Sequence, residues 1–324
     1  MTKTMIKLKN IRKIYDLGEV KVEALKGVSL EVKEREFTVI MGPSGSGKTT
    51  LLNMVGALDL PTSGRIIVDG IDITDFSEDQ VGYIRCKKIG FIFQFFNLLP
   101  LLTAAENVEL PMLFKGELTP AESTARAKEL LTIVGLGDRI YHRPSELSGG
   151  QQQRVAIARS FANNPSLILA DEPTGNVDTL TAVEILRLMK RLNREEGQTF
   201  VIITHDPGVA GVASRSIYVL DGEIALSLPP GVAPPSDHIA KRMYEDINVK
   251  IQKISKLKVQ IEQFKSDLNL FLKRKNEIEP SLYHRTKDEY VRRINDLQKT
   301  ILAAVESTKE EFIFDQIKKG KDDE

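Results

Sequence analysis

A glycine-rich segment between a strand and a helix constrains this sequence more than any other feature. Gly42-Pro-Ser-Gly-Ser-Gly-Lys-Thr49 follows a β-branched run over 37–41 and precedes a helical pattern over 49–58. Glycine permits dihedrals that turn successive NH groups inward, and a helix amino-terminus adds partial positive charge. The spacing fits the phosphate-binding P-loop. We therefore expect an α/β fold that holds nucleotide phosphates here.

The residues of this segment have separate expected roles. Lys48 is expected to reach the β- and γ-phosphates and to act in catalysis, and Thr49 to offer its hydroxyl to Mg²⁺. ATP and Mg²⁺ are the expected ligands. The other expected nucleotide contacts in the segment are Gly42, Ser44, Gly45, Ser46, Gly47 and Thr50.

Two adjacent acids end a second apolar run. Residues 167–170 are followed by Asp171 and Glu172. Because neighbouring side chains of a strand point to opposite sides, two different roles are physically reasonable. We assign Asp171 to the metal and Glu172 to general-base work on water.

Further strands are expected at 200–204, ending at His205, and at 217–220, before the Asp221-Gly222 turn. Short β-branched runs alternate with helical patterns up to about Ser227, as in an α/β domain with a mostly parallel sheet. The carboxyl ends of such strands are where ligands usually bind.

Leu147-Ser-Gly-Gly-Gln151 opens another helix, with Ser148 placed as its N-cap. A P-loop, this LSGGQ segment and the two-acid strand about twenty residues later together resemble the ABC ATPases. The resemblance covers roughly 6–224. It implies an ABC-type nucleotide-binding domain with a mostly parallel core sheet, an antiparallel β subdomain and a helical subdomain.

The resemblance also implies partners and further site residues. Two cassettes would close head to tail, each ATP lying between one P-loop and the partner's LSGGQ, so Ser148 and Gly150 would contact the γ-phosphate across the dimer. Other matching positions are Tyr15 for adenine stacking, Gln94 for Mg²⁺, water and coupling to a permease, 96–102 for the permease groove, Asp178 for communication between the sites, and His205 for the γ-phosphate.

Local stretches look like the subgroup of lipoprotein-releasing, macrolide-exporter and cell-division ATPases. They are 24–30, 56–64, Glu106-Asn107-Val108 with Pro111, and Gly175-Asn176. Two features depart from that pattern: Arg35-Glu36 stands where glycine-glutamate is usual, and a helical tail follows the cassette.

The tail defines the expected domain organisation: an ATPase domain over 1–227, a proline-rich linker over 228–240 and a helical extension over 241–320. Apolar residues recur every seven positions, which is typical of a coiled coil. One series is Ile247, Ile254, Ile261 and Leu268; the interleaved series is Leu257, Phe264 and Phe271, with Lys250 at a seam position. A second stripe comprises Tyr290, Ile294, Leu297, Ile301 and Ala304. We expect an antiparallel helical hairpin; a dimerising coiled coil is the alternative.

Bulk properties limit the partners. The 45 basic and 45 acidic residues cancel, so no global field would gather nucleic acid. No run approaches the length of a spanning helix, and the first ten residues lack a secretory signal. We expect a cytoplasmic ATPase, peripheral at the inner face of the membrane, that drives a separate permease in export, lipoprotein release or mechanotransmission. A soluble ABC ATPase acting on nucleic acid or the ribosome is the alternative.

Overall fold

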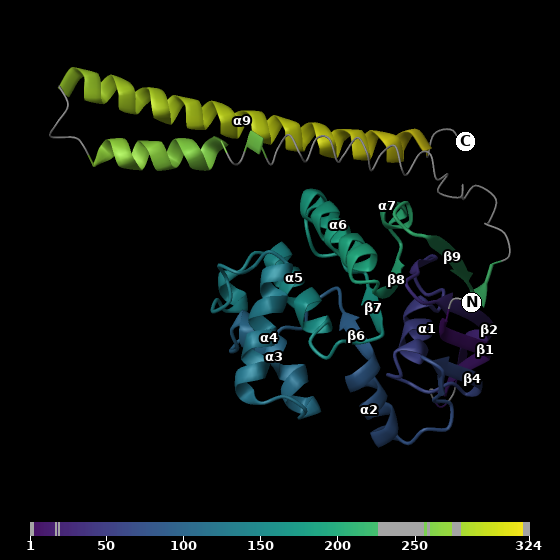
Figure 1. Ribbon diagram of the computed structural model, residues 1–324. Coiled ribbons are helices and arrows are strands. Elements are labelled where there is room, and N and C mark those ends of the chain that lie inside the picture. The colour runs from purple at the N-terminus through teal and green to yellow at the C-terminus, as the bar shows by residue number, and fades with distance from the viewer. Residues whose placement is uncertain are drawn as a thin grey trace. The chain divides into compact units, whose positions relative to one another are not determined.

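The computed structural model describes residues 3–16, 18, 20–225, 256–257, 260–273 and 280–319, leaving out the side chains of 207, 282, 302 and 304–319. Contacts divide the chain into two units, Met1–Ala240 and Lys241–Glu324. The first unit holds two sheets and the helices between their strands (Figure 1). The predicted linker 228–240 lies outside the described residues, so the domain boundaries stay a prediction.

The larger sheet has six strands in the order β10-β9-β3-β8-β7-β6, all parallel except β10. Its strands are β3 (Phe37–Met41), β6 (Ile89–Ile92), β7 (Leu167–Asp171), β8 (Thr199–Thr204), β9 (Arg215–Leu220) and β10 (Glu223–Ile224). Every residue of β8 is buried, because strands inside a parallel sheet are covered on both faces. The predicted mostly parallel core sheet is confirmed.

The smaller sheet is antiparallel, in the order β2-β1-β4-β5. It consists of β1 (Thr4–Asp16), β2 (Lys21–Lys33), β4 (Ser63–Val68) and β5 (Ile71–Asp72). Its buried face joins the core of the larger sheet around α1 (Lys48–Val55). The predicted helix over 49–58 is too long, because Gly56 caps α1 and Ala57 adopts a left-handed φ of 52°.

The other helices of this unit lie around the two sheets (Figure 1). They are α2 (Glu78–Lys88), α3 (Ala104–Lys115), α4 (Pro120–Ile133), the short 3₁₀ turn η1 (Pro144–Glu146), α5 (Gly149–Ser160), α6 (Thr179–Glu195) and α7 (Pro207–Ala210). Helices α3, α4 and α5 pack together as a helical subdomain. Each of these three begins with a capping box, at Thr103, Thr119 and Ser148. The sequence-predicted N-cap at Ser148 is confirmed.

Helix α5 packs against the backbone of strand β6 at Gly90. A Cβ atom there would lie 2.2 Å from the Ser160 carbonyl oxygen and 2.6 Å from Ile168 Cδ1. Overpacking of this kind costs about 1–3 kcal/mol. We therefore expect Gly90→Ala to lower the free energy of unfolding of the cassette by about that amount, measured by urea denaturation followed by circular dichroism.

Gly82 provides the matched control for Gly90. It lies inside α2, and the nearest heavy atom to an added Cβ would be 3.8 Å away, at the Arg85 guanidinium. Alanine favours a helix interior over glycine by about 0.8–1.0 kcal/mol, so Gly82→Ala should preserve or raise stability. Equal losses in both variants would contradict the steric explanation.

Arg35 adopts a left-handed φ of 65° in the turn between β2 and β3. This conformation explains why glycine is usual at the position. The Arg35 amide donates to Thr199 Oγ1 at 2.9 Å, and Asn193 Nδ2 donates to the Arg35 carbonyl oxygen at 2.9 Å. These two hydrogen bonds hold the turn in a left-handed conformation that the Arg35 side chain disfavours.

The second unit contains helical residues 260–272 and α9 (Pro280–Lys319). Ring centroids lie 5.3 Å apart for Phe271 and Tyr283, and 6.2 Å apart for Phe264 and Tyr290. The earlier phenylalanine, Phe264, pairs with the later tyrosine, Tyr290, so the two helices run antiparallel. Ile261 and Ile294 are buried with Tyr283. The predicted hairpin is confirmed; Ile247, Lys250 and Ile254 lie outside the described residues, as does the side chain of Ala304.

None of the helices in the described part of the chain combines the length and apolar character that crossing a membrane requires.

Candidate functional site

The P-loop joins β3 to α1. Gly45 and Gly47 have left-handed φ values of 79° and 98°, and Gly47 caps α1. The loop is compressed between two neighbours: a Cβ at Gly42 would lie 2.1 Å from the Val219 carbonyl oxygen, and one at Gly47 would lie 2.6 Å from that of Ala24. Close approach of backbone to backbone therefore requires glycine at both positions.

A cavity of about 390 Å³ opens beside the P-loop. Of the predicted nucleotide contacts, its lining includes Gly45, Gly47, Lys48, Thr49 and Thr50. The remaining lining residues are Val22, Glu23, Ala24 and Lys26 of β2 and the Asp221-Gly222 turn, none of which was predicted as a site residue. The sequence signal for the turn was the Asp-Gly pair, which favours a type I′ hairpin. Asp221 and Gly222 have the positive φ values that such a turn requires, 49° and 82°.

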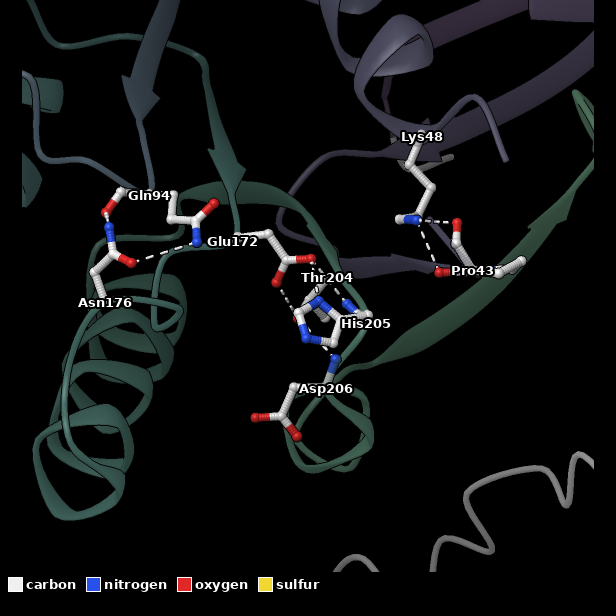
Figure 2. A network of polar contacts seen from close by, with 9 residues as sticks. Pro43, Lys48, Gln94, Glu172, Asn176, Thr204, His205 and Asp206 are labelled. Atoms are coloured by element: carbon white, nitrogen blue, oxygen red, sulfur yellow. Dashed lines mark hydrogen bonds and ion pairs between the residues drawn. The ribbon is translucent and has the colours of Figure 1, made fainter. Parts of the chain in front are cut away.

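Lys48 folds back onto its own loop. Its Nζ donates to the carbonyl oxygens of Gly42 at 2.8 Å and Pro43 at 2.7 Å (Figure 2). Burial lowers the pKa of the ammonium, and the carboxylates of Glu172 and Asp171 oppose that shift. The P-loop lysine thus lies in the electrostatic field of both acids at the end of β7.

Glu172 is held by the end of the neighbouring strand. Thr204 Oγ1 donates to Glu172 Oε2 at 2.8 Å, and Nδ1 of His205 lies 2.7 Å from Oε1, which also accepts from the His205 main-chain NH at 3.0 Å (Figure 2). Glu172 adopts a left-handed φ of 44°, a strained conformation that surrounding contacts must maintain. The predicted base and the predicted phosphate-sensing histidine are therefore in direct contact. The role of Thr204 was not predicted.

Asp171 lies at the end of β7 beside Glu172. Burial raises the pKa of its carboxyl group, the Glu172 charge adds to that increase, and Lys48 opposes it. A cation at this position would remove the electrostatic penalty of two adjacent carboxylates.

Gln94 follows β6 and contacts the loop that follows β7. The Gln94 side-chain Nε2 lies 3.4 Å from Asn176 Oδ1, and the Gln94 main-chain carbonyl oxygen accepts from Asn176 Nδ2 at 3.0 Å (Figure 2). Asp178, two residues further, caps α6 by accepting from the Leu180 and Thr181 amides at 3.1 and 3.2 Å. Strand ends β6, β7 and β8 thus bring Gln94, Glu172 and His205 to one edge of the sheet.

Other predicted nucleotide contacts are not among the described residues that line the cavity. They are Gly42, Ser44 and Ser46 of the P-loop, together with Tyr15, Ser148 and Gly150. Ser148 and Gly150 begin α5. Gly150 lies close to α6, because a Cβ atom added there would be 2.2 Å from Thr181 Cγ2. Tyr15 donates its hydroxyl to Asp59 Oδ2 at 3.0 Å, and Lys13 Nζ lies 4.9 Å from the ring centroid.

The predicted metal ligands fit a magnesium ion by their chemistry. Thr49, Gln94 and Asp171 offer hydroxyl, amide and carboxylate oxygens, which are hard donors of the kind that Mg²⁺ prefers. Within the described ranges, no group of three or more histidine, cysteine, aspartate or glutamate residues could form an all-protein metal cage. A Mg²⁺ ion that shares its coordination with substrate phosphates requires no such cage.

The fold and the site together define a P-loop nucleotide-binding cassette. A model described as "ABC transporter" matches residues 25–175. An ABC transporter ATP-binding protein of Thermotoga maritima is 55% identical over 223 residues, which cover 68% of this chain and 94% of that one. The chain belongs to the ABC transporter family, as an ATP-hydrolysing cassette.

Relatives of the predicted subgroup are also found. A macrolide export ATP-binding/permease protein of Syntrophobacter fumaroxidans is 52% identical over 221 residues, covering 68% of this chain and 31% of that protein. Similarity to the macrolide-exporter subgroup is therefore confirmed. The comparisons give no support to the nucleic-acid alternative, since these relatives are named as transporter ATPases.

Solved structures show the same fold. A dimeric structure of a post-hydrolysis state of the ATP-binding cassette MJ0796, bound to ADP and Pi, has a TM-score of 0.63 and 53% identity, covering 68% of this chain and 96% of that one. A second dimeric structure of that cassette has 54% identity and the same TM-score of 0.63. The ABC-type fold predicted from the sequence is confirmed.

Proposed function

We propose that two copies of this cassette close head to tail on two ATP molecules and drive a separate membrane permease from the cytoplasmic side. The observation that carries the proposal is that Lys48 and Thr49 of the P-loop line the cavity, whereas Ser148 and Gly150, at the start of α5, do not. A second copy would supply them. The dimeric state of the related cassette supports this arrangement.

In the proposed reaction Glu172 orients a water molecule and accepts its proton as the water oxygen attacks the γ-phosphorus. The bond from that phosphorus to the β–γ bridging oxygen breaks, and ADP leaves. Lys48 leaves the Gly42 and Pro43 carbonyl oxygens and pairs with the phosphate oxygens, where its charge stabilises the transition state. His205 exchanges its Glu172 contact for the γ-phosphate. Asp178 caps helix α6, and in the proposed dimer it communicates with the facing cassette.

A bound Mg²⁺ would neutralise negative charge on the phosphates. Thr49, Gln94 and Asp171 would hold it, because their oxygen donors fit that ion. The raised pKa of Asp171 supports this assignment, since a carboxylate disfavoured by burial and a like charge gains most from a nearby cation.

The permease would contact the surface after Gln94. Phe95 and Leu101 are 73% and 81% exposed, and Phe114 at the end of α3 is 78% exposed. Asn107 of α3 fixes this loop by accepting from the Leu99 amide at 2.7 Å. Exposed apolar side chains on a rigid support are typical of interaction sites. In this proposal the coupling region begins directly after Gln94.

Co-purification tests the proposed partner. Glu172→Gln protein, tagged and expressed in its native host, is solubilised gently from membranes with ATP and its companions are identified. Recovery of a multispanning permease would support the proposal, and recovery of soluble proteins or nucleic acid alone would contradict it. Three apolar-to-polar changes at Phe95, Leu101 and Phe114 should abolish the recovery, whereas the same change at exposed Tyr141 should not.

Tyr15 is proposed to stack on adenine. Aromatic contacts of this kind contribute about 0.5–1.5 kcal/mol, so Tyr15→Ala should weaken ATP binding about two- to tenfold, as measured by calorimetry. Tyr15→Phe retains the ring while removing the Asp59 hydrogen bond, and should bind ATP within about twofold of the parent. Equal affinity of the alanine variant and the parent would rule out stacking.

A further inference from the structure

Asn176 contacts both the side chain and the main chain of Gln94, a residue 82 positions earlier in the sequence (Figure 2). Only its NH₂ group can donate to the Gln94 carbonyl oxygen, at 3.0 Å, which fixes the orientation of the carboxamide. Its Oδ1 then faces Gln94 Nε2 at 3.4 Å. The NH₂ group and the oxygen of the Asn176 carboxamide therefore contact the main-chain carbonyl and the side-chain NH₂ group of Gln94, respectively.

Gly175 provides the space for this contact. A Cβ atom at Gly175 would lie 2.8 Å from Gln94 Nε2 and 3.2 Å from Gln94 Cδ. Gly175 is not among the residues with positive φ, so its backbone conformation is open to any residue. Steric space for Gln94 accounts for the glycine.

The segment after Gln94 is held from another direction by helix α5. Phe96 and Asn97 have successive left-handed φ values of 52° and 50°, and Arg159 donates to both carbonyl oxygens, at 2.7 and 2.5 Å. Gly149 at the start of α5 completes the junction, because a Cβ there would lie 3.6 Å from the Asn176 carbonyl oxygen and 3.7 Å from the Phe96 ring. The LSGGQ helix, the loop 175–178 and the loop after Gln94 therefore meet at one point.

We propose that Asn176 is a positioning residue that transmits movement of the loop 175–178 to Gln94. The inference rests on the proposed function, in which that loop responds to the facing cassette and Gln94 serves the metal and the permease. Because Asn176 binds a main-chain carbonyl as well as the side chain, displacement of the loop displaces the Gln94 backbone. The contact sets the position from which Gln94 reaches the metal.

Amide hydrogen exchange, measured without nucleotide, tests whether Asn176 positions the Gln94 segment. In this loop the Phe96 amide donates to the Phe93 carbonyl oxygen at 3.3 Å, and the Leu102 amide to that of Leu99 at 3.2 Å. In Asn176→Ala, and in Asn176→Asp, which lacks the donor, peptides covering 91–102 should exchange about three- to tenfold faster. The control Asp138→Ala removes a side chain that is 72% exposed and should leave exchange unchanged. Unchanged exchange in the Asn176 variants would overturn the proposal.

The Mg²⁺ dependence of ATP hydrolysis tests the consequence. Asn176→Ala should raise the half-saturating Mg²⁺ concentration about three- to tenfold, and adding it to Gln94→Ala should cause no further increase. Additive effects, or a shift in Gln94→Ala but not in Asn176→Ala, would overturn the inference while leaving the proposed function intact. Faster exchange in Asn176→Ala combined with no Mg²⁺ shift in Gln94→Ala would support the link and refute the metal role of Gln94.

Discussion

Replacing Glu172 with glutamine is expected to slow ATP turnover about 10²- to 10⁴-fold, the contribution typical of general-base catalysis. Glutamine keeps the shape of the side chain, and its amide oxygen can still accept from the His205 main-chain NH or from Thr204. It cannot accept a proton from water at neutral pH. Phosphate release at saturating ATP measures the effect, and steady-state turnover near that of the parent would remove Glu172 from the role of base.

The same variant should accumulate as an ATP-bound dimer. Hydrolysis would normally weaken the interface, so blocking the chemical step leaves the closed state populated. Size-exclusion chromatography with and without ATP measures this shift. His205→Ala is an informative companion, because it removes the ring contact to Glu172 but leaves the carboxylate and its Thr204 hydrogen bond in place. Slow turnover in both variants, with a stable dimer only in Glu172→Gln, would separate the two roles.

Local sequence patterns predicted much of the architecture. The apolar runs at 37–41 and 167–170 became β3 and β7 with shifts of at most one residue, because a short apolar run bounded by glycine or acidic residues is typical of a buried strand. The two apolar stripes predicted a helical hairpin, and Phe264 of one stripe lies 6.2 Å from Tyr290 of the other between ring centroids. Strand order, in contrast, depends on contacts between distant segments, and no periodicity specifies that β3 lies between β9 and β8.

The contacts around the site were less predictable than its main residues. Lys48 and Glu172 belong to short motifs, and the residue spacing of those motifs was enough to predict their chemistry. Thr204 and Asn176 reach Glu172 and Gln94 across 32 and 82 residues of sequence, respectively. A threonine before a histidine and an asparagine in a glycine turn are common in many settings. Only the convergence of three strand ends makes them neighbours of the predicted site residues.

Lys48→Met should lower ATP turnover about 10²- to 10³-fold, as expected when one preorganised donor to the transition-state charge is removed. Methionine resembles the aliphatic part of lysine but carries no charge. In the free protein, the Gly42 and Pro43 carbonyl oxygens lose their donor, so a thermal melt must first establish that the variant is folded. Phosphate release then measures turnover, and Lys9→Met, at an exposed position of β1, serves as the matched control.

Lys48→Met and Glu172→Gln should differ in whether they form the ATP-dependent dimer. Lys48 is proposed to act on the phosphates of bound ATP, whereas Glu172 acts on the water that attacks them. Lys48→Met should therefore fail to form the ATP-dependent dimer, and adding it to Glu172→Gln should abolish the dimer that Glu172→Gln forms. The double variant tests this order directly, because binding must precede chemistry. A stable ATP-bound dimer in the double variant, together with slow turnover in Lys48→Met alone, would show that Lys48 contributes to the chemical step without contributing to closure.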